Sequence, residues 1–447
     1  MTIQRASWRT VRLQDVCEYI TVGHVGPMVN EYRETGIPFL RSQNVRPFRF
    51  DPAELKFISP DFHAKLRKSA LRPNDVVVTR SGANTGQCCI IPPYLTDANC
   101  SDLVILRPSK RINPWFLMYV LNSDWGRATI AGGVVGAAQH HFNIGVAKQF
   151  SVLLPALPLQ HRIAGILSAY DELIENCDRR ARVLEEIARS MYRDIISDGA
   201  AKPVAFASMP YWTFITENIA PYEETKRYYA TADVVGLNIQ GKGIDYTFSE
   251  RPSRAQKSPE VFSVWFARMK DTYKIAWFSD LNRAVANRSI LSSGFAGFRA
   301  SEPQFFPLLF LAVSSSEFHT QKDRFCTGAT QMSLTNEGLA RIEMPLLTQR
   351  LARQLGTQCL PILNEMLVLQ MKVENLRRTR DLLLPRLLSG QVPLDASGVE
   401  GVAEPTAPAP PLSQTDLTSE EPALRAAEDT PPYRVERKGR LEAKTHI

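Results

Sequence analysis

Three short stretches of the sequence carry residue types that could do catalytic chemistry. Ile91-Pro92-Pro93-Tyr94 has the prolines and the aromatic residue of a motif that grips an amine during methyl transfer, but the apolar Ile91 stands where that motif needs a polar side chain. Asn113-Pro114-Trp115-Phe116 lacks the second proline and is typical of a helix start. The glycine-rich Gly294–Phe298 lacks the surrounding strand–loop–helix pattern of a cofactor site. The residues therefore predict no catalytic site, and without a P-loop motif they predict no bound ATP.

The cysteines and histidines show no metal-binding pattern. The chain has seven of each. The odd number of cysteines forms no Cys-x-x-Cys pair, and the histidines lack the spacing of metal ligands. We therefore expect reduced thiols, no disulfides, no metal site and no cofactor in this chain.

Polar side chains cluster in loops that follow predicted strands. Arginine and lysine can bond to guanine, and asparagine and glutamine to adenine, when such loops are exposed and rigidly supported. In the first half of the chain the candidates are Arg41, Gln43, Asn44, Arg80, Ser81, Asn84, Thr85, Gln139, His140 and His141. In the second half, as their equivalents, they are Asn238, Gln240, Lys242, Thr330, Gln331 and Ser333. Any one of them is ordinarily a solvated loop residue, so residue type alone leaves both interpretations open.

Two features of these loops allow other roles. The glycine-rich loop Arg80–Gly86 could cradle a phosphate through its backbone amides, although a plain hairpin turn explains the same residues. Gln139 and Gln331 recur in both halves, so they could hold a shared loop shape or contact a phosphate without reading a base.

Two long stretches must position these loops, and both have the apolar spacing of a coiled coil. The first covers about residues 157–196 and the second about residues 347–388. Apolar residues recur alternately every four and three positions, with one arginine in each series. We expect the helices to pair through Leu184, Ile187, Met191, Arg180, Leu369, Val373, Leu376 and Arg380. The two arginines could fix the register of the pair or face a partner or DNA.

The sequence upstream of the helices also repeats, with Gly136 aligned to Gly328 and Pro155 to Pro345. The period, about 190 residues, is far longer than that of a solenoid, so each repeat is a globular domain followed by one long helix. Short strands, many turns and a few helices make each domain α+β. The expected segments are a first target domain at 1–154, a central helix at 155–198, a second domain at 199–343, a C-terminal helix at 344–390 and a tail at 391–447.

Composition sets further bounds on the chain. Its 447 residues carry a net charge of +7, which is compatible with a polyanionic partner but only weakly indicates one. The apolar runs are shorter than the roughly 18 residues of a membrane helix, and the first residues lack a signal core, so we expect a cytoplasmic protein. The tail is rich in proline, alanine, glutamate and threonine, a composition that predicts disorder.

Several passages, in this order, are similar to the DNA specificity subunits of type I restriction–modification systems. They are GIPFLRSQNV from Gly36, LRPNDVVVTRSGANTG from Leu71, GGVVGAAQHHFNIG from Gly132, LPLQHRIAGIL from Leu157 and VENLRRTRDLLLPRLLSGQV from Val373. The resemblance covers about residues 8–392. One departure is Asn74, where these proteins commonly carry glycine; asparagine also tolerates a left-handed turn.

This resemblance implies an arrangement for the whole chain. Each globular unit would be a target recognition domain, and the long helices would form an antiparallel coiled coil that separates the domains with pseudo-twofold symmetry. Each domain would read one half of a split, asymmetric double-stranded DNA sequence. The chain would be non-catalytic: modification subunits would methylate adenine with S-adenosylmethionine, and restriction subunits using ATP and Mg would complete the endonuclease complex.

The resemblance also gives the polar loops a role. It implies a DNA-facing surface on each domain, so the loop residues named above, taken as a set, are predicted DNA contacts. Two alternatives stay open: a coiled-coil adaptor that docks protein partners without reading DNA, and an orphan subunit that serves modification only. DNA footprinting separates the first, because an adaptor gives no sequence-specific protection.

Paired long helices predict a fixed spacing between the two half-sites. One matched heptad inserted in both helices, after Leu173 and at the facing turn of the second, preserves the apolar spacing and adds about 10 Å of helix. The unread spacer should grow by roughly 2–3 base pairs, at about 3.4 Å per pair, while both half-sites stay unchanged. Genome-wide mapping of methylated sites checks this, and methylation at the original spacing would exclude a ruler.

Overall fold

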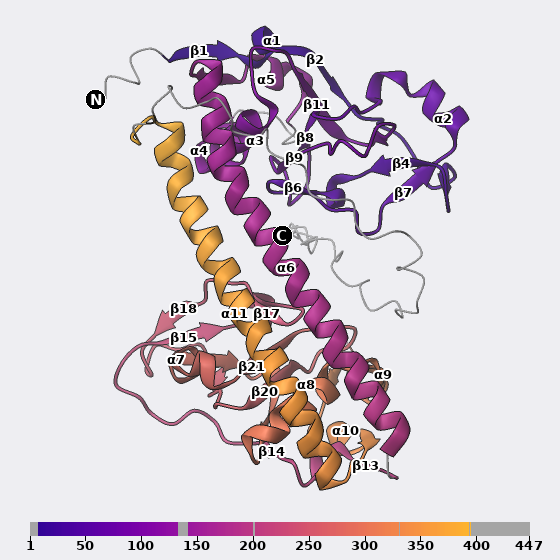
Figure 1. Ribbon diagram of the computed structural model, residues 1–447, viewed down its shortest axis with the longest axis vertical. Helices are drawn as coiled ribbons and strands as arrows, with labels where there is room; N and C mark the ends of the chain where they lie inside the picture. The colour runs from indigo at the N-terminus through magenta and orange to yellow at the C-terminus, as the bar shows by residue number, and fades with distance from the viewer. Residues whose placement is uncertain (1–7, 133–141, 200–201, 330, 393, 395–447) are drawn as a thin grey trace, which may run out of the picture. The chain divides into compact units, whose positions relative to one another are not determined.

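The computed structural model describes residues 8–132, 142–199, 202–329, 331–392 and 394 (Figure 1). The contacts within the chain define two compact units, and both long helices contribute to each of them. The described residues up to Arg179 and those from Met371 onward form unit 1, whereas Arg180–Gln370 form unit 2. In both units helices and strands are mixed, as the sequence predicts.

Unit 1 is built on two four-stranded sheets. The first has the order β2-β11-β8-β9 and is antiparallel; the second has the order β10-β4-β7-β3, in which β10 and β4 are parallel. The strands of these sheets are β2 (Cys17–Val22), β3 (Tyr32–Arg33), β4 (Ile37–Leu40), β7 (Lys56–Ile58), β8 (Val76–Thr79), β9 (Cys88–Ile90), β10 (Asn99–Cys100) and β11 (Leu103–Pro108). Two further antiparallel pairs join β1 (Arg9–Arg12) to β12 (Ser151–Leu154) and β5 (Val45–Arg46) to β6 (Arg49–Phe50).

The helices of unit 1 are short apart from the two long ones. They are α1 (Leu13–Val16), α2 (Pro60–Lys65), α3 (Pro114–Asn122), α4 (Asp124–Gly132) and α5 (Ile144–Gln149), with 3-10 turns η2 (Ser42–Asn44) and η3 (Arg67–Ser69). Helix α3 begins as the sequence predicts, because the Asn113 side chain accepts a hydrogen bond of 3.0 Å from the Phe116 amide and Pro114 occupies the first turn. Asn74 adopts φ +69°, the left-handed turn expected at this position.

The core of unit 1 follows from its apolar strands. All four residues of β8 are fully buried, which explains the continuous run of β-branched side chains there. Helix α3 covers this sheet with buried side chains that include Phe116 and Tyr119. The sheet is therefore a rigid support for the loops that leave its strand ends.

Unit 2 repeats this plan. Its first sheet has the order β14-β23-β20-β21 and its second the order β18-β15-β22-β19, in which β15 and β22 are parallel. The strands are β14 (Trp212–Ile215), β15 (Lys226–Tyr229), β18 (Ile244–Tyr246), β19 (Ala255–Lys257), β20 (Ser263–Ala267), β21 (Ile275–Phe278), β22 (Ser289–Ser292) and β23 (Phe295–Ala300). Shorter pairs join β13 (Pro203–Ala205) to β26 (Glu343–Pro345), β16 (Val234–Val235) to β17 (Asn238–Ile239) and β24 (Cys326–Thr327) to β25 (Ser333–Leu334).

The helices of unit 2 are α7 (Arg283–Arg288), α8 (Phe306–Ser314), α9 (Ser316–Arg324) and α10 (Asn336–Ala340), with 3-10 turns η4 (Phe206–Ser208), η5 (Thr231–Asp233), η6 (Asp280–Asn282) and η7 (Pro303–Phe305). They match those of unit 1 in order only after the first sheet, because α7 follows β21 whereas α2 precedes β8. Helices α8 and α9 follow the last strand of the first sheet, as α3 and α4 do in unit 1. The repeat inferred from the helix flanks therefore extends through the secondary structure of both globular parts.

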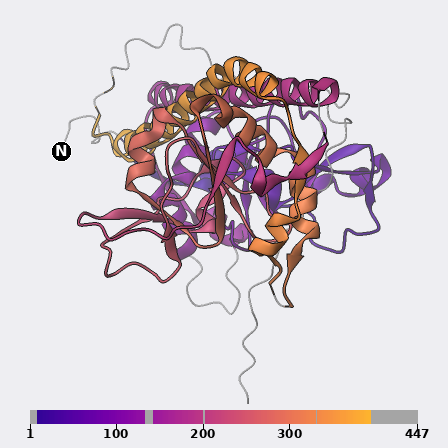
Figure 2. The same cartoon turned by 90° about the horizontal axis from the view of Figure 1, so that it is seen from below.

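The long helices are α6 (Leu157–Gly199) and α11 (Gln349–Leu388), and they lie side by side in both views (Figures 1 and 2). In unit 1 they run in opposite directions, because Asp171 pairs with Arg380 and Asp178 with Arg377. The Arg380 guanidinium also lies 4.2 Å from the centre of the Phe48 ring, so this arginine joins the helix pair to the β5–β6 hairpin region.

In unit 2 the same two helices pair through Arg180 and Glu365, at 3.1 Å. Leu184 and Met191 pack against the core, and Leu369 is buried. Ile187 is a correction to the predicted seam, since it is 44% exposed while its neighbour Ala188 is fully buried. Of the predicted positions of α11 in unit 1, Val373 is buried and Leu376 is half-buried.

Within the described residues, no helix is both long enough and apolar enough to cross a membrane.

Gly356 is a point of close approach between α11 and the globular part of unit 2. A Cβ at this position would lie 1.9 Å from the backbone oxygen of Gln304. Alanine in place of glycine usually stabilises a helix, but here the backbone would have to move. Gly356→Ala should lower the free energy of unfolding by about 1–3 kcal/mol. The exposed Gln358→Ala serves as the control and should change it by less than about 0.5 kcal/mol. Chemical denaturation measures both, and a stabilised Gly356→Ala protein would contradict this packing.

Candidate nucleic-acid interface

Three strand ends of unit 1 converge on one short segment. Strands β4 and β10 are parallel neighbours, and the amide of Ser101 donates to the backbone oxygen of Leu40 at 3.0 Å. Strand β8 ends opposite the start of β11, because Thr79 pairs with Leu103. The loops that begin at Arg41 and Arg80 therefore both leave the sheets beside residues 100–102.

The loop after β4 is held by its own side chains. Arg41 donates to the backbone oxygen of Glu54 at 2.8 Å, and its guanidinium lies 5.9 Å from the centre of the Tyr32 ring. Gln43 donates to the Glu54 carboxylate at 2.8 Å. Both residues are half-buried, so each polar head is held by Glu54 and still reaches solvent.

Asn44 has a different role from the base contact predicted for it. It is fully buried, and its side-chain oxygen accepts from the Arg41 amide at 3.0 Å. Its amide nitrogen donates to the backbone oxygens of Asp51 at 3.0 Å and Ala53 at 2.9 Å. These bonds use both of its donor hydrogens, so in this structure Asn44 shapes the loop and has no donor left for a base.

The loop after β8 meets the turn between β10 and β11. Arg80 forms an ion pair of 2.7 Å with Asp102, and the Ser81 hydroxyl donates to the other carboxylate oxygen at 2.8 Å. Thr85 donates to the backbone of Gly82, and Asn84 accepts from Gln87, so these two predicted contacts also fold the loop on itself. The loop is thus a closed turn, as the hairpin interpretation predicts.

Unpartnered polar atoms gather around these two loops. Among the described residues, seven buried side-chain nitrogen or oxygen atoms lack a hydrogen-bond partner. Four of them are Arg41 Nε, Thr79 Oγ1, Arg80 Nε and Gln87 Oε1. Buried polar atoms are nearly always satisfied in folded proteins, so these four atoms set the two loops apart from most of unit 1.

Unit 2 has the same loop framework with other side chains. Ala230 donates its amide to Asp233 at 2.7 Å, as Arg41 does to Asn44, and the amide of Gln240 donates to the Asp233 backbone oxygen, as that of Asp51 does to Asn44. Position by position, Arg41 therefore matches Ala230, and Gln43 matches Ala232. The equivalence predicted for Asn238, Gln240 and Lys242 is wrong: these residues follow the η5 turn, on β17 and the exposed turn after it.

Arg268 is the residue of unit 2 that sequence reasoning missed. Ala267 pairs with Phe295 as Thr79 pairs with Leu103, so Arg268 occupies the position of Arg80. Its backbone oxygen accepts from the Leu334 amide at 2.8 Å, as that of Arg80 accepts from Phe142 at 3.1 Å. The arginine directly after a buried strand in both halves was the available signal.

The environment of Arg268 differs from that of Arg80. Its guanidinium donates to the backbone oxygen of Leu334 at 2.9 Å and to Asn336 Oδ1 at 2.8 Å, and burial lowers its pKa. The fully buried Lys322 fixes the loop that follows, because its ammonium donates to the backbone oxygens of Met269 at 2.9 Å and Thr272 at 2.8 Å.

Only two of the remaining predicted contacts fall within the described residues. Gln139, His140, His141 and Thr330 fall outside the described residues. Gln331 is exposed, and Ser333 pairs with Thr327 in β25, so only part of the second loop can be placed.

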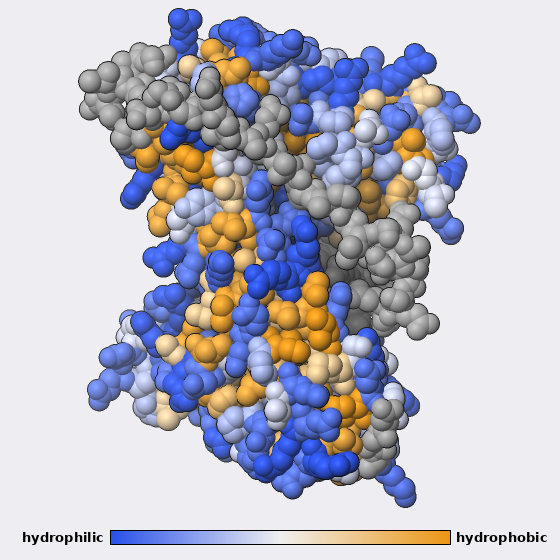
Figure 3. Space-filling model, viewed as in Figure 1, coloured by the Kyte–Doolittle hydropathy of each residue, from blue (hydrophilic) through white to orange (hydrophobic). Residues whose placement is uncertain are grey.

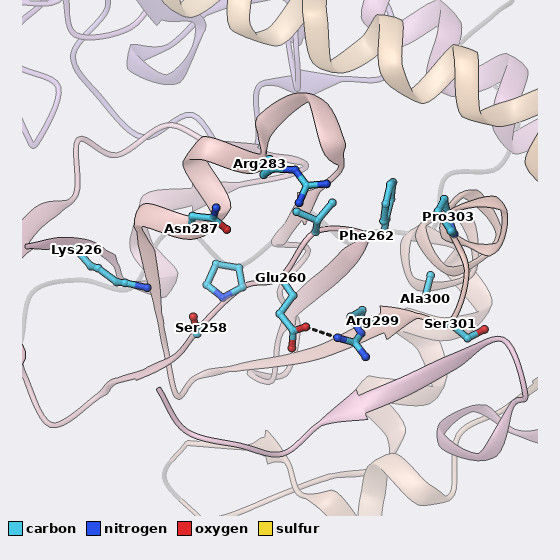
Figure 4. Close-up of a pocket in the computed structure, with 12 residues that line it drawn as sticks. Lys226, Ser258, Glu260, Phe262, Arg283, Asn287, Arg299, Ala300, Ser301 and Pro303 are labelled. Carbon is cyan, nitrogen blue, oxygen red and sulfur yellow. Dashed lines mark hydrogen bonds and ion pairs between the residues drawn. The ribbon is translucent and has the colours of Figure 1, made fainter. Parts of the chain in front are cut away.

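An open groove of about 640 Å³ lies at the other ends of β20 and β23 in unit 2 (Figure 4). Lys226, Arg283 and Arg299 line it together with Glu260, which pairs with Arg299. Arg283 pairs with Asp280, and burial lowers the pKa of Lys226. None of the predicted contact residues lines this groove.

No group of three or more His, Cys, Asp or Glu side chains within the described ranges is placed to hold a metal ion. The described cysteines are free thiols, and burial raises the pKa of Cys359 to about 11.

Loss of the Asn44 side chain should destabilise unit 1. Asn44→Ala leaves one backbone amide and two backbone oxygens without partners, so the free energy of unfolding should fall by about 1–3 kcal/mol. Ser42→Ala, at the exposed neighbouring position of the same turn, is the matched control and should change it by less than about 0.5 kcal/mol. Equal stability of the two variants in urea denaturation would show that the amide does not hold the loop.

Comparisons with known proteins agree on one family. Residues 6–186 match the family model described as "Type I restriction modification DNA specificity domain". A protein of Methanocaldococcus jannaschii named as the MjaX specificity subunit of a type I restriction enzyme is 25% identical over 207 residues, which are 44% of this chain and 48% of the relative. The MjaVIII specificity subunit of the same organism is 23% identical over 199 residues, 44% of each chain. The chain thus spans about half the length of the curated relatives it matches.

One solved structure supports the fold independently of sequence. The type I restriction–modification S subunit from M. genitalium superposes with a TM-score of 0.51 at 15% identity, over 85% of this chain and 96% of that one. The resemblance to type I specificity subunits is thus confirmed: residues 6–186 match the family model, and two named specificity subunits are similar in sequence.

Proposed function

We propose that the chain is the DNA-reading subunit of a type I restriction–modification complex, in which each unit binds one half of a split target. The observation that carries this proposal is the repeat itself. The two units have equivalent first sheets with the same register at the strand ends. The side chains of the loops differ: Arg41 and Gln43 in unit 1 stand where unit 2 has Ala230 and Ala232. One framework with two sets of loop residues suits a reader of two different sequences.

The chemistry of the unit 1 loops supports contact with bases. Arg41, Gln43 and Arg80 are each half-buried, and their polar heads are held by Glu54 or Asp102. An arginine fork matches the two major-groove acceptors of guanine, and a glutamine amide matches adenine.

The long helices support a second part of the proposal, in which they form an antiparallel coiled coil that docks modification subunits. Both units expose large apolar residues on these helices. In unit 1 they are Leu157, Leu173, Met371 and Leu382, and in unit 2 they are Val183, Ile187 and Val368. Apolar surface shows over the helices in the space-filling view (Figure 3). Such surface is typical of a protein–protein interface.

In this proposal the reactions belong to the partners. Modification subunits would methylate adenine with S-adenosylmethionine, and restriction subunits would use ATP and Mg. Footprinting with the chain and its modification partner tests the reading role: protection should be sequence-specific and split into two half-sites. Protection of DNA without sequence preference, or no protection, would favour an adaptor.

Replacing the two readers of one loop should affect one half-site. Arg41→Ala with Gln43→Ala gives unit 1 the residues that unit 2 carries at these positions, so the η2 turn should be retained. Each lost base contact costs about 1–3 kcal/mol, so affinity for the target should fall about tenfold or more. Discrimination at the other half-site should stay unchanged. Binding titrations with each half-site scrambled in turn measure this.

The matched control is Arg49→Ala, an exposed arginine of the neighbouring β6. It removes one positive charge from the same region without altering the η2 turn. If the double variant weakens binding to both half-sites equally, or no more than Arg49→Ala does, the two residues do not read bases.

A further inference from the structure

The two units treat their equivalent arginines differently. In unit 1 Arg80 pairs with the carboxylate of Asp102, whereas in unit 2 Gly294 occupies the position of Asp102, directly before the strand that pairs with β20. The Arg268 amide donates to the backbone oxygen of Gly294 at 2.8 Å, which fixes this equivalence. An acidic residue on a proposed DNA-binding surface repels phosphates. Since only unit 1 has one at this position, Asp102 needs a functional explanation.

Asp102 is built to hold Arg80. Its backbone adopts φ +48°, a left-handed conformation that asparagine, aspartate and glycine tolerate best. Its amide donates to the backbone oxygen of His24 at 3.1 Å, and its two carboxylate oxygens accept from Arg80 at 2.7 Å and from Ser81 at 2.8 Å. The local fold therefore aims the carboxylate at the arginine.

The ion pair between Arg80 and Asp102 is weak enough for another acceptor to replace Asp102. The side chains of Arg80 and Asp102 are 23% and 40% exposed, so water and salt weaken their attraction. A single DNA phosphate offers Arg80 an ion pair of about the same strength as the one with Asp102. The negative charge of the DNA also repels the Asp102 carboxylate. Guanine offers two acceptors in one plane, and the amino group of its cytosine partner can donate a hydrogen bond to a carboxylate. A G·C pair can therefore satisfy both residues in the major groove.

We propose that Asp102 is a specificity-determining residue: it holds Arg80 away from phosphates and from wrong bases, and releases it to a G·C pair in the half-site of unit 1. This inference rests on the proposed function. Unit 2, with glycine at this position, has no such competitor for Arg268, so the two half-sites should differ in how strictly one G·C position is read.

The test uses the full chain with its modification partner and Asp102→Asn. The variant keeps the size and the left-handed backbone and removes the charge. Affinity for DNA with the unit 1 half-site scrambled should rise about tenfold, while affinity for the intact target changes by less than about threefold. The salt dependence of this non-specific binding should steepen by about one unit, because Arg80 gains a phosphate. Asp102→Gly, the residue found in unit 2, should act in the same way.

Two controls separate release of Arg80 from a general change of charge. Glu54→Gln removes one carboxylate of the same unit but frees no ion-paired arginine, since Arg41 bonds to the Glu54 backbone. It should not raise non-specific affinity or steepen its salt dependence as Asp102→Asn does. In an Arg80→Ala background, Asp102→Asn should have no effect, which a double-mutant cycle measures.

Three results would overturn the inference. They are equal gains with and without Arg80, equal gains at both half-sites, and a general loss of affinity that marks a structural role. Wild-type protein in the same titrations keeps this test distinct from the proposed function. If the wild type shows no half-site discrimination, the proposed function fails; if it discriminates and Asp102→Asn does not differ, only the role of Asp102 fails.

Discussion

The pairing of β8 with β11, and of β20 with β23, is the constraint on which the loops of both units depend. It places Thr79 opposite Leu103 and Ala267 opposite Phe295, so each strand delivers an arginine to the same sheet edge. A shift by one residue would turn every side chain of the strand to the other face, and the fully buried residues of β8 make such a shift costly. The position of each arginine is therefore set by core packing several residues away.

The long helices and the repeat could be predicted because their signals are local. Heptad spacing depends on few residues, and α11 buries or half-buries each predicted position. Ile187 shows the limit: in α6 the buried positions move by one residue, to Ala188 and Tyr192, because the helix packs against a globular domain as well as against α11. A heptad pattern cannot report a second packing partner.

The loops were harder to predict because residue type does not report burial. Asn44 was a predicted base contact, but its side-chain amide forms hydrogen bonds with three backbone groups of the loop. In unit 2 the equivalent positions carry Ala230 and Ala232, which have no polar side chain, so residue type pointed to Asn238, Gln240 and Lys242 instead. Arg80 was found beside glycines, whereas Arg268 lies in a stretch without them. Only the strand pairing shows that these two arginines are equivalent.

Ala230 and Ala232 of unit 2 show how one framework can carry two different sets of loop side chains. The η2 and η5 turns are closed by a backbone amide and by the side chain of Asn44 or Asp233, so the positions between contribute little to the turn itself. Those positions are free to carry arginine and glutamine in one unit and alanine in the other. At the β8 and β20 ends the arginine is constant, and its neighbour changes from Asp102 to Gly294. Variation thus takes two forms on the same framework. In one loop two polar side chains are present or absent, and in the other a constant arginine pairs with Asp102 in unit 1 and bonds to Leu334 and Asn336 in unit 2.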